Sequence, residues 1–105
     1  MKHQQIDPRQ REKVRAEFAP SWELVENSQL QKTFRAQDHR QAIEFISACM
    51  LPSERLDHFP DVAFFYNEIL MRITHHDSGG LVDSSYILAR AIDQAAEKMG
   101  ISGQV

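Results

Sequence analysis

Apolar residues recur at helical spacing in the middle and in the last part of the chain, and each stripe predicts one amphipathic helix. The middle helix follows Asp38, a residue type that caps helices, and Gln41 stands three residues later as a capping-box partner would. The last helix takes Asp83 as its cap and ends at Gly100. The two stripes are Ala42, Phe45, Ile46, Cys49 and Met50, and Leu88, Ala89, Ile92, Ala95, Ala96 and Met99.

The N-terminal segment, residues 1–20, predicts a short charged helix. Asp7 is typical of an N-cap, and Pro8 is typical of the first helical position. The helix runs to about Phe18, and Pro20 ends it.

In residues 21–26 and 30–36, apolar and polar side chains alternate instead of following the helical period. In the first run Trp22 and Leu24 share one face. The turn pair Asn27-Ser28 separates the two runs, so they predict a β-hairpin. The residues that share a face in the second run are Leu30, Lys32, Phe34 and Ala36.

Residues 62–75 are rich in aromatic and β-branched side chains and predict two strands, or one strand broken near Asn67. In the second half Ile69, Met71 and Ile73 point to one face. The same parity places His76 on the opposite face.

Two positions conflict with regular structure. Pro52 lies inside the middle helix, where a proline costs about 3 kcal/mol, so we expect a kink or a restart near Ser53. The tail, residues 101–105, is expected to be loose.

The order helix, strand, strand, helix, strand, strand, helix predicts an α+β fold. We expect one domain, residues 1–105, with a four-stranded, mostly antiparallel sheet and helices packed on one face.

Composition narrows the function. The formal net charge of −3 argues against non-specific nucleic-acid binding, which needs a basic face. The chain has no apolar run near the roughly 20 residues of a membrane span, and its first residues lead into no signal-like run, so a cytoplasmic protein is expected. Cys49, the only cysteine, is expected to be a small core residue.

Candidate chemistry comes from Glu54, His58 and His76, with Tyr66 between the histidines. Two imidazoles facing one ligand can act as proton donor and acceptor, because histidine titrates near neutral pH. Glu54 lies four residues before His58, so it can hold one imidazole nitrogen if the helix continues through both. The alternative is that Glu54 is an ordinary surface residue.

No metal site is expected. His75 and His76 are adjacent in a strand and point to opposite faces, and the chain has no cysteine cluster with zinc-ligand spacing. The aromatic run from Phe64 to Tyr66 can be a platform for a planar ligand, or can be divided between the core and a subunit interface. One face or edge of the sheet is expected to pair with another subunit.

One set of residues resembles the signature of the pterin-4α-carbinolamine dehydratases: Glu54, His58, Pro60, Tyr66 and His76. The predicted helix end at residues 53–58 and the turn at residues 74–81 resemble the family as well. The likeness covers roughly residues 21–99.

The resemblance implies elimination of water from a 4a-hydroxytetrahydropterin, with no metal or cofactor. His58 and His76 would be the acid/base pair, and Glu54 would support His58. The residues that it places around the substrate are Phe59, Pro60, Tyr66 and Asp77.

The chain departs from the family where Phe59 replaces a second histidine or asparagine, and where Asp61-Val62-Ala63 lacks a tryptophan. This motivates a second hypothesis, a dehydratase-like protein that has lost activity and binds proteins, as do the RuBisCO assembly factors of carboxysome-bearing bacteria. The partner is thus a pterin or RuBisCO subunits, and a homodimer or homotetramer is expected.

Overall fold

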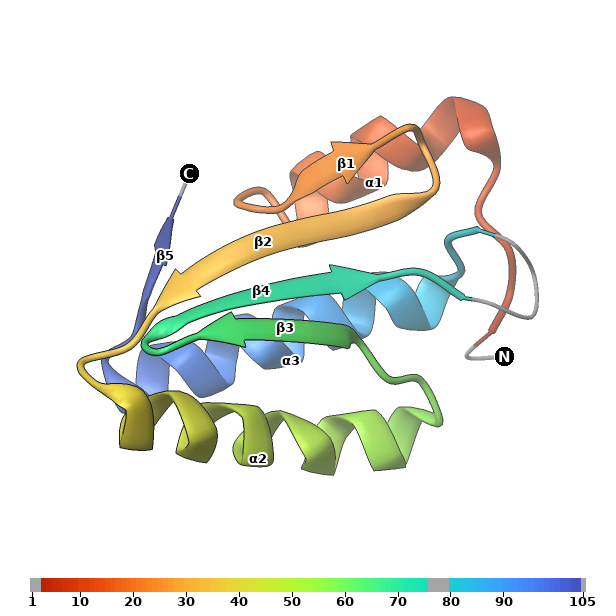
Figure 1. Ribbon diagram of the computed structural model, residues 1–105. Coiled ribbons are helices and arrows are strands. Elements are labelled where there is room, and N and C mark those ends of the chain that lie inside the picture. Colours follow the sequence, from red (N-terminus) through yellow and green to blue (C-terminus); the bar gives the residue numbers. More distant parts are fainter. Residues whose placement is uncertain (1–2, 76–79, 105) are drawn as a thin grey trace.

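The computed structural model describes residues 3–75 and 80–104. They form three α-helices, a short 3-10 helix (η1) and five strands (Figure 1). The elements in chain order are η1 (Pro8–Gln10), α1 (Arg11–Phe18), β1 (Glu23–Val25), β2 (Gln29–Arg35), α2 (His39–Leu56), β3 (Asp61–Phe65), β4 (Glu68–Ile73), α3 (Asp83–Met99) and β5 (Ser102–Gln104).

The strands form one antiparallel sheet in the order β1-β2-β4-β3, and β5 pairs with β2. β1 and β5 share one edge of β2: β1 pairs with its first half and β5 with its second half. The predicted α+β class and the antiparallel sheet with packed helices are confirmed. The predicted strand number, four, is corrected to five.

The hairpin predicted around Asn27 is present. Glu26 and Asn27 have φ values of 52° and 56°, and the Ser28 N–H donates to the Val25 carbonyl at 3.0 Å. Three residues, 26–28, separate the paired Val25 and Gln29, and the two positive φ values put the turn in the left-handed region, which asparagine adopts more readily than most residues.

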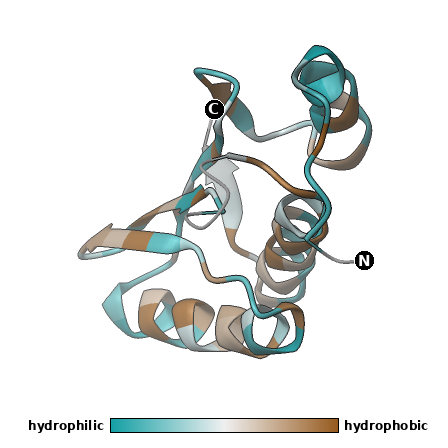
Figure 2. Cartoon of the chain, turned by 90° about the vertical axis from the view of Figure 1, so that its right-hand side faces the viewer, coloured by the Kyte–Doolittle hydropathy of each residue, from teal (hydrophilic) through white to brown (hydrophobic). Residues whose placement is uncertain are grey.

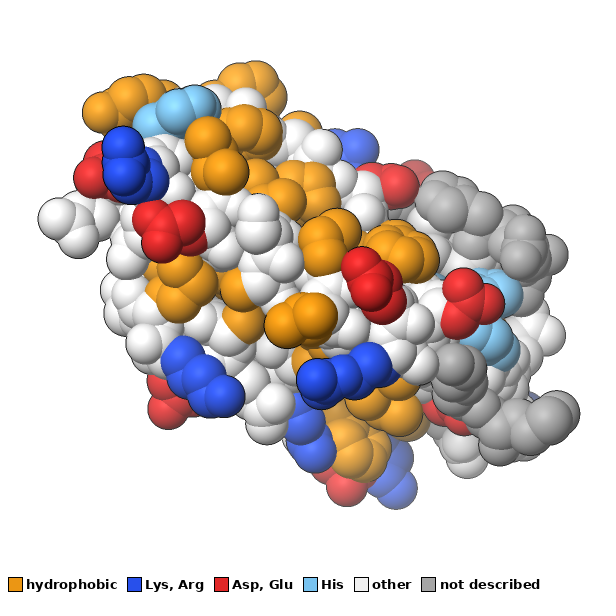
Figure 3. Space-filling view, turned by 90° about the horizontal axis from the view of Figure 1, so that it is seen from below, with side chains coloured by type: hydrophobic (Ala, Val, Ile, Leu, Met, Phe, Trp, Pro, Cys, Tyr) orange, Lys and Arg blue, Asp and Glu red, His pale blue; other side chains and the backbone are white. Residues whose placement is uncertain are grey.

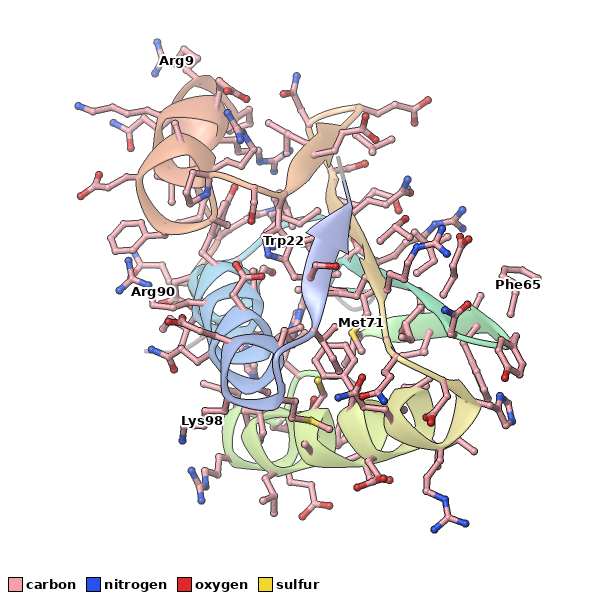
Figure 4. The ribbon with its side chains drawn as sticks, turned by 90° about the vertical axis from the view of Figure 1, so that its left-hand side faces the viewer. Arg9, Trp22, Phe65, Met71, Arg90 and Lys98 are labelled. Atoms are coloured by element: carbon pink, nitrogen blue, oxygen red, sulfur yellow. The ribbon has the colours of Figure 1, made fainter. Side chains whose placement is uncertain are left out.

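The core lies between the sheet and helices α2 and α3 (Figure 2). Leu30 and Phe34 of β2 and Ile69, Met71 and Ile73 of β4 are all 0% exposed, which confirms the predicted parity. Figure 4 shows Met71 pointing into this layer, whereas Phe65 points away at the end of the β3–β4 hairpin.

Helix α2 begins as predicted, because the Asp38 side chain accepts a hydrogen bond from the Gln41 N–H at 2.9 Å. The restart expected near Ser53 is wrong: one helix continues past Pro52 to Leu56. The Ser53 hydroxyl donates back to the Cys49 carbonyl at 2.7 Å and does not cap a new turn. Phe45, Cys49 and Ser53 recur every four residues and are 0% exposed, so packing against the core holds the helix through the proline.

Helix α3 begins one residue earlier than predicted, because Val82 is the N-cap and Asp83, the predicted cap, is the first helical residue. It ends at Gly100, as expected, and the φ of 70° there suits glycine. The Ile101 N–H donates to the Ala96 carbonyl at 2.9 Å, which turns the chain toward the sheet.

The tail expected to be loose is instead strand β5, and Ile101 before it is 6% exposed. Burial of Ile101 and pairing with β2 offset the ordering entropy that leaves most tails free. Gly103 allows the close approach, since a Cβ there would lie 2.4 Å from Cε of Lys32. Val105 lies outside the described residues.

None of the helices described is both long enough and apolar enough to cross a membrane.

Candidate functional site

The end of helix α2 fixes the position of His58. Asp57 adopts the left-handed conformation with φ 51°, and its N–H donates to the Glu54 carbonyl at 3.2 Å. The His58 N–H donates to the Ser53 carbonyl at 3.0 Å. These two bonds form a Schellman motif, which turns the chain off the helix. The His58 side chain is directed inward and is 3% exposed.

His75 reaches the same place from the end of β4. Its N–H donates to the Gly80 carbonyl at 2.9 Å, and its carbonyl accepts from the Gly80 N–H at 3.3 Å. Its ring stacks on the ring of His58, with centroids 5.2 Å apart and an interplanar angle of 11°.

A third imidazole comes from the N-terminal segment. The Gln4 carbonyl accepts from the Asp83 N–H at 2.8 Å, and the Gln4 N–H donates to Oδ1 of Asp83 at 3.0 Å. This places the His3 ring 4.7 Å from His75 and 6.0 Å from His58, centroid to centroid. Sequence reasoning missed His3, because only the tertiary fold brings the chain start to these two residues.

Two buried serines of α3 lie against the histidines. Ser84 Oγ is 2.8 Å from Nδ1 of His3, and Ser85 Oγ is 3.5 Å from Nε2 of His58. Ser85 Oγ also accepts the Val82 N–H at 3.1 Å, so it caps the helix and leaves its own proton for another acceptor. Both serines are 0% exposed; the Ser85–His58 contact is buried, whereas the Ser84–His3 contact is part-buried.

Glu54 does not share a helical face with His58, because α2 ends at Leu56 and His58 lies beyond its cap. Glu54 is exposed, and among the described residues its carboxylate forms no hydrogen bond or ion pair. The sequence left two alternatives for Glu54, a partner of His58 or an ordinary surface residue. The structure places Glu54 at an exposed position on the last turn of α2.

The residues after His58 divide between surface and interior. Phe59 is 48% exposed, whereas Pro60 is buried at the start of β3. The other two candidates next to the histidines, His76 and Asp77, lie outside the described residues.

Tyr66 lies at the opposite end of the β3–β4 hairpin from His58. The five residues of β3 separate them by roughly 16 Å at about 3.3 Å per residue. There Tyr66 has φ 55°, and its carbonyl lies 2.9 Å from Nδ1 of His39. The structure does not gather Tyr66 into the histidine group.

An aromatic group forms where Tyr66 lies. The His39 ring stacks with the rings of Phe64 and Tyr66, at centroid distances of 5.5 and 5.8 Å. Figure 3 shows a histidine among apolar side chains at one end of the molecule and further histidine side chains at the other.

Cys49 is a core residue, as predicted. Burial raises the pKa of its thiol to about 12, so at neutral pH it is neither a nucleophile nor a metal ligand.

Residues 4–95 match the family model described as pterin 4 alpha carbinolamine dehydratase. A protein of Saccharolobus solfataricus is 38% identical over 74 residues, which cover 70% of this chain and 76% of the relative. One of Picosynechococcus is 36% identical over 75 residues, covering 71% and 80%. Both carry the name pterin-4-alpha-carbinolamine dehydratase only provisionally.

Among solved structures, a Brucella melitensis protein described as a transcriptional coactivator/pterin dehydratase matches with a TM-score of 0.79. The match covers 88% of this chain and 98% of that one, and the 20% identity supports the shared fold alone. The family model, by contrast, spans nearly the whole chain and includes His58 and His75. The chain therefore belongs to the pterin 4 alpha carbinolamine dehydratase family.

Proposed function

We propose that the protein dehydrates a 4a-hydroxytetrahydropterin to the quinonoid dihydropterin, with His58 in one of the two proton-transfer roles. The observation that supports the proposal is the helix-ending motif that fixes the backbone of His58, the residue that the sequence resemblance assigns to proton transfer. A positioned imidazole contributes about 10²–10⁴-fold to a proton-transfer step.

The reaction needs two proton transfers. One group donates a proton to the hydroxyl on C4a, so that the C–O bond breaks and water leaves. Another group accepts the proton from N5, and the electron pair released forms the new double bond. Imidazole suits both roles, because its pKa lies near the working pH.

His58 has a partner that can orient it for this work. Ser85 Oγ lies 3.5 Å from Nε2 and accepts a backbone N–H from Val82, so its hydroxyl proton is available for the ring nitrogen. Such a bond selects the tautomer with the proton on Nδ1. The second proton-transfer residue, His76, stays a prediction of the sequence.

Access to His58 requires movement, since the side chain is 3% exposed. His3 is the neighbour contributed by the chain start, and its segment is joined to α3 through Gln4 and to Leu81 through Ile6. We propose that this segment moves aside when a pterin binds.

The test follows the loss of 4a-hydroxytetrahydropterin absorbance by stopped flow, against the rate in buffer. We expect His58→Ala to lower kcat by about 10²–10⁴-fold. His39→Ala removes an exposed histidine at the far end of the hairpin and should leave kcat unchanged.

The melting temperature of each variant separates lost chemistry from lost folding. Should His58→Ala unfold, His58→Gln, which keeps much of the side-chain volume, replaces it. The proposal is wrong if the wild-type protein does not accelerate the reaction over buffer. It is also wrong if His39→Ala lowers kcat as much as the His58 variant does.

Protein binding without catalysis is a second candidate function, and the outer edge of the sheet favours it. β3 pairs with β4 and with no other strand among the described residues. Phe64, Phe65 and Tyr66 on and after it are 40%, 71% and 67% exposed. An open strand edge with exposed aromatic side chains is typical of a surface that pairs with another chain.

Sedimentation velocity tests this candidate with the protein alone and with RuBisCO subunits, the partner that the sequence resemblance suggests. Phe65→Ser should reduce association. Leu51→Ser, which changes a residue 59% exposed on α2, is the matched control. Equal effects of both substitutions would contradict a specific role for the β3 edge.

A further inference from the structure

We propose that His3, His58 and His75 form a binding site for one divalent transition-metal ion, with Zn²⁺ as the preferred occupant. Each residue offers one ring nitrogen, and these three atoms lie within 4.8 Å of one another. Metal binding does not depend on the dehydratase reaction, although its consequence for His58 does.

The geometry is close to that of a three-histidine site. Zinc–nitrogen bonds of about 2.1 Å in a tetrahedral arrangement place the nitrogens about 3.4 Å apart. Closing from 4.8 Å to that spacing needs displacements of roughly 1 Å, which side-chain rotations supply. The fourth tetrahedral position is then left for water or a ligand, as in open zinc sites.

The three ligands come from three separate parts of the fold. His3 belongs to the N-terminal segment, which lies along the start of α3. His58 follows α2, and His75 follows β4. The backbones of His58 and His75 are held by the hydrogen bonds at Ser53 and Gly80. The binding site is therefore largely formed before an ion arrives.

A supporting contact orients His3. Ser84 Oγ, which is fully buried, lies 2.8 Å from Nδ1 of His3, so Nε2 remains for the ion. Hydrogen bonds of this kind fix the tautomer and direction of metal-binding histidines, and their loss costs 10–100-fold in affinity.

The donor set selects the class of ion. Three neutral imidazoles suit zinc, copper or nickel, whereas calcium and magnesium require oxygen ligands. Cys49 does not compete, because its thiol is buried and its pKa is raised to about 12.

Occupancy has a mechanical and a chemical consequence. The ion would tie the N-terminal segment to the ends of α2 and β4 and hold it over His58. The ion would replace the proton on the ring nitrogen of His58 that does not face Ser85, so His58 could no longer exchange that proton with a substrate. If the proposed function holds, Zn²⁺ therefore inhibits dehydration reversibly.

Binding is measured on the full chain without a histidine tag, by competition with a chromogenic zinc chelator. We expect one Zn²⁺ per chain and a rise in Tm of at least about 5 °C at 100-fold excess over Kd. Co²⁺ should give the visible absorption of a tetrahedral nitrogen site without a sulfur charge-transfer band.

Two substitutions identify the ligands. His3→Gln can still bond to Ser84 but should weaken zinc binding by at least 10–100-fold, and so should His75→Ala. His39→Ala is the control, because His39 stacks with Phe64 and Tyr66 and not with the cluster. Melting curves of the metal-free variants confirm that they fold.

Wild-type protein that binds zinc no better than His3→Gln would overturn the proposal, as would equal weakening by His39→Ala. These readouts contain no pterin, so failure of the dehydratase reaction leaves them unaffected. Conversely, an active enzyme that binds no zinc would refute only the metal site.

Discussion

The two ends of the β3–β4 hairpin both carry stacked rings, but in opposite surroundings. At one end His58 stacks on His75 and is 3% exposed. At the other end His39 stacks on Tyr66, which is 67% exposed. The chain start and α3 cover the end at His58. At the other end, no further strand of the described residues pairs with β3.

This difference separates chemistry from recognition. A buried imidazole experiences strong local electrostatics and fixed neighbours, which favour proton transfer and metal binding. Exposed aromatic rings favour association with another protein surface, because burying their apolar area there lowers the free energy. The proposed functions thus divide the hairpin into a reactive end, at His58 and His75, and an adhesive end, at Phe64, Phe65 and Tyr66.

The largest stability effect should come from the covered end. Ile73 is 0% exposed and lies two residues before His75, so Ile73→Ala should destabilise the fold by about 2–5 kcal/mol. Phe65→Ala at the adhesive end should cost less than about 0.5 kcal/mol, since Phe65 is 71% exposed. Urea denaturation of both variants measures the contrast, and similar costs would show that the two ends do not differ in this way.

A smaller effect is expected at Phe59, which is 48% exposed beside His58. Phe59→His adds a hydrogen-bonding group where the sequence resemblance implies one, and under the proposed function one such bond to a bound pterin should raise kcat/KM by about tenfold. Phe64→His places the same side chain at the adhesive end, 40% exposed, and should not change kcat/KM. An unchanged rate in Phe59→His would count against a pterin bound next to His58.

The smallest effects concern the backbone at the two ends. Asp57 and Tyr66, before and after β3, have φ values of 51° and 55°. Glycine adopts this conformation without a Cβ clash, so Asp57→Gly should stabilise the protein by up to about 1 kcal/mol. Tyr66→Gly should gain less, because it also removes the stack on His39. Thermal melts compare the two, and a greater gain at Tyr66 would reverse the expected order.

Local signals were sufficient for much of the fold. The capping residue Asp38, the turn at Asn27 and the terminating Gly100 act through bonds with near neighbours, so the sequence predicts them. Alternation in β4 identified the buried face, because side-chain direction in a strand depends only on parity. Pro52 was misjudged, since burial of Phe45 and Cys49 outweighed a local penalty.

The amino-acid sequence by itself determined the α+β class and the buried stripes, because these depend on periodicity, and a family motif singled out His58 as a candidate. Only the tertiary structure decided that His3 joins His58 and His75, that Tyr66 lies a strand's length away, and that the tail becomes β5. These are contacts between residues far apart in the chain, and no short-range pattern encodes them. They form when burial of apolar surface fixes the relative positions of whole elements.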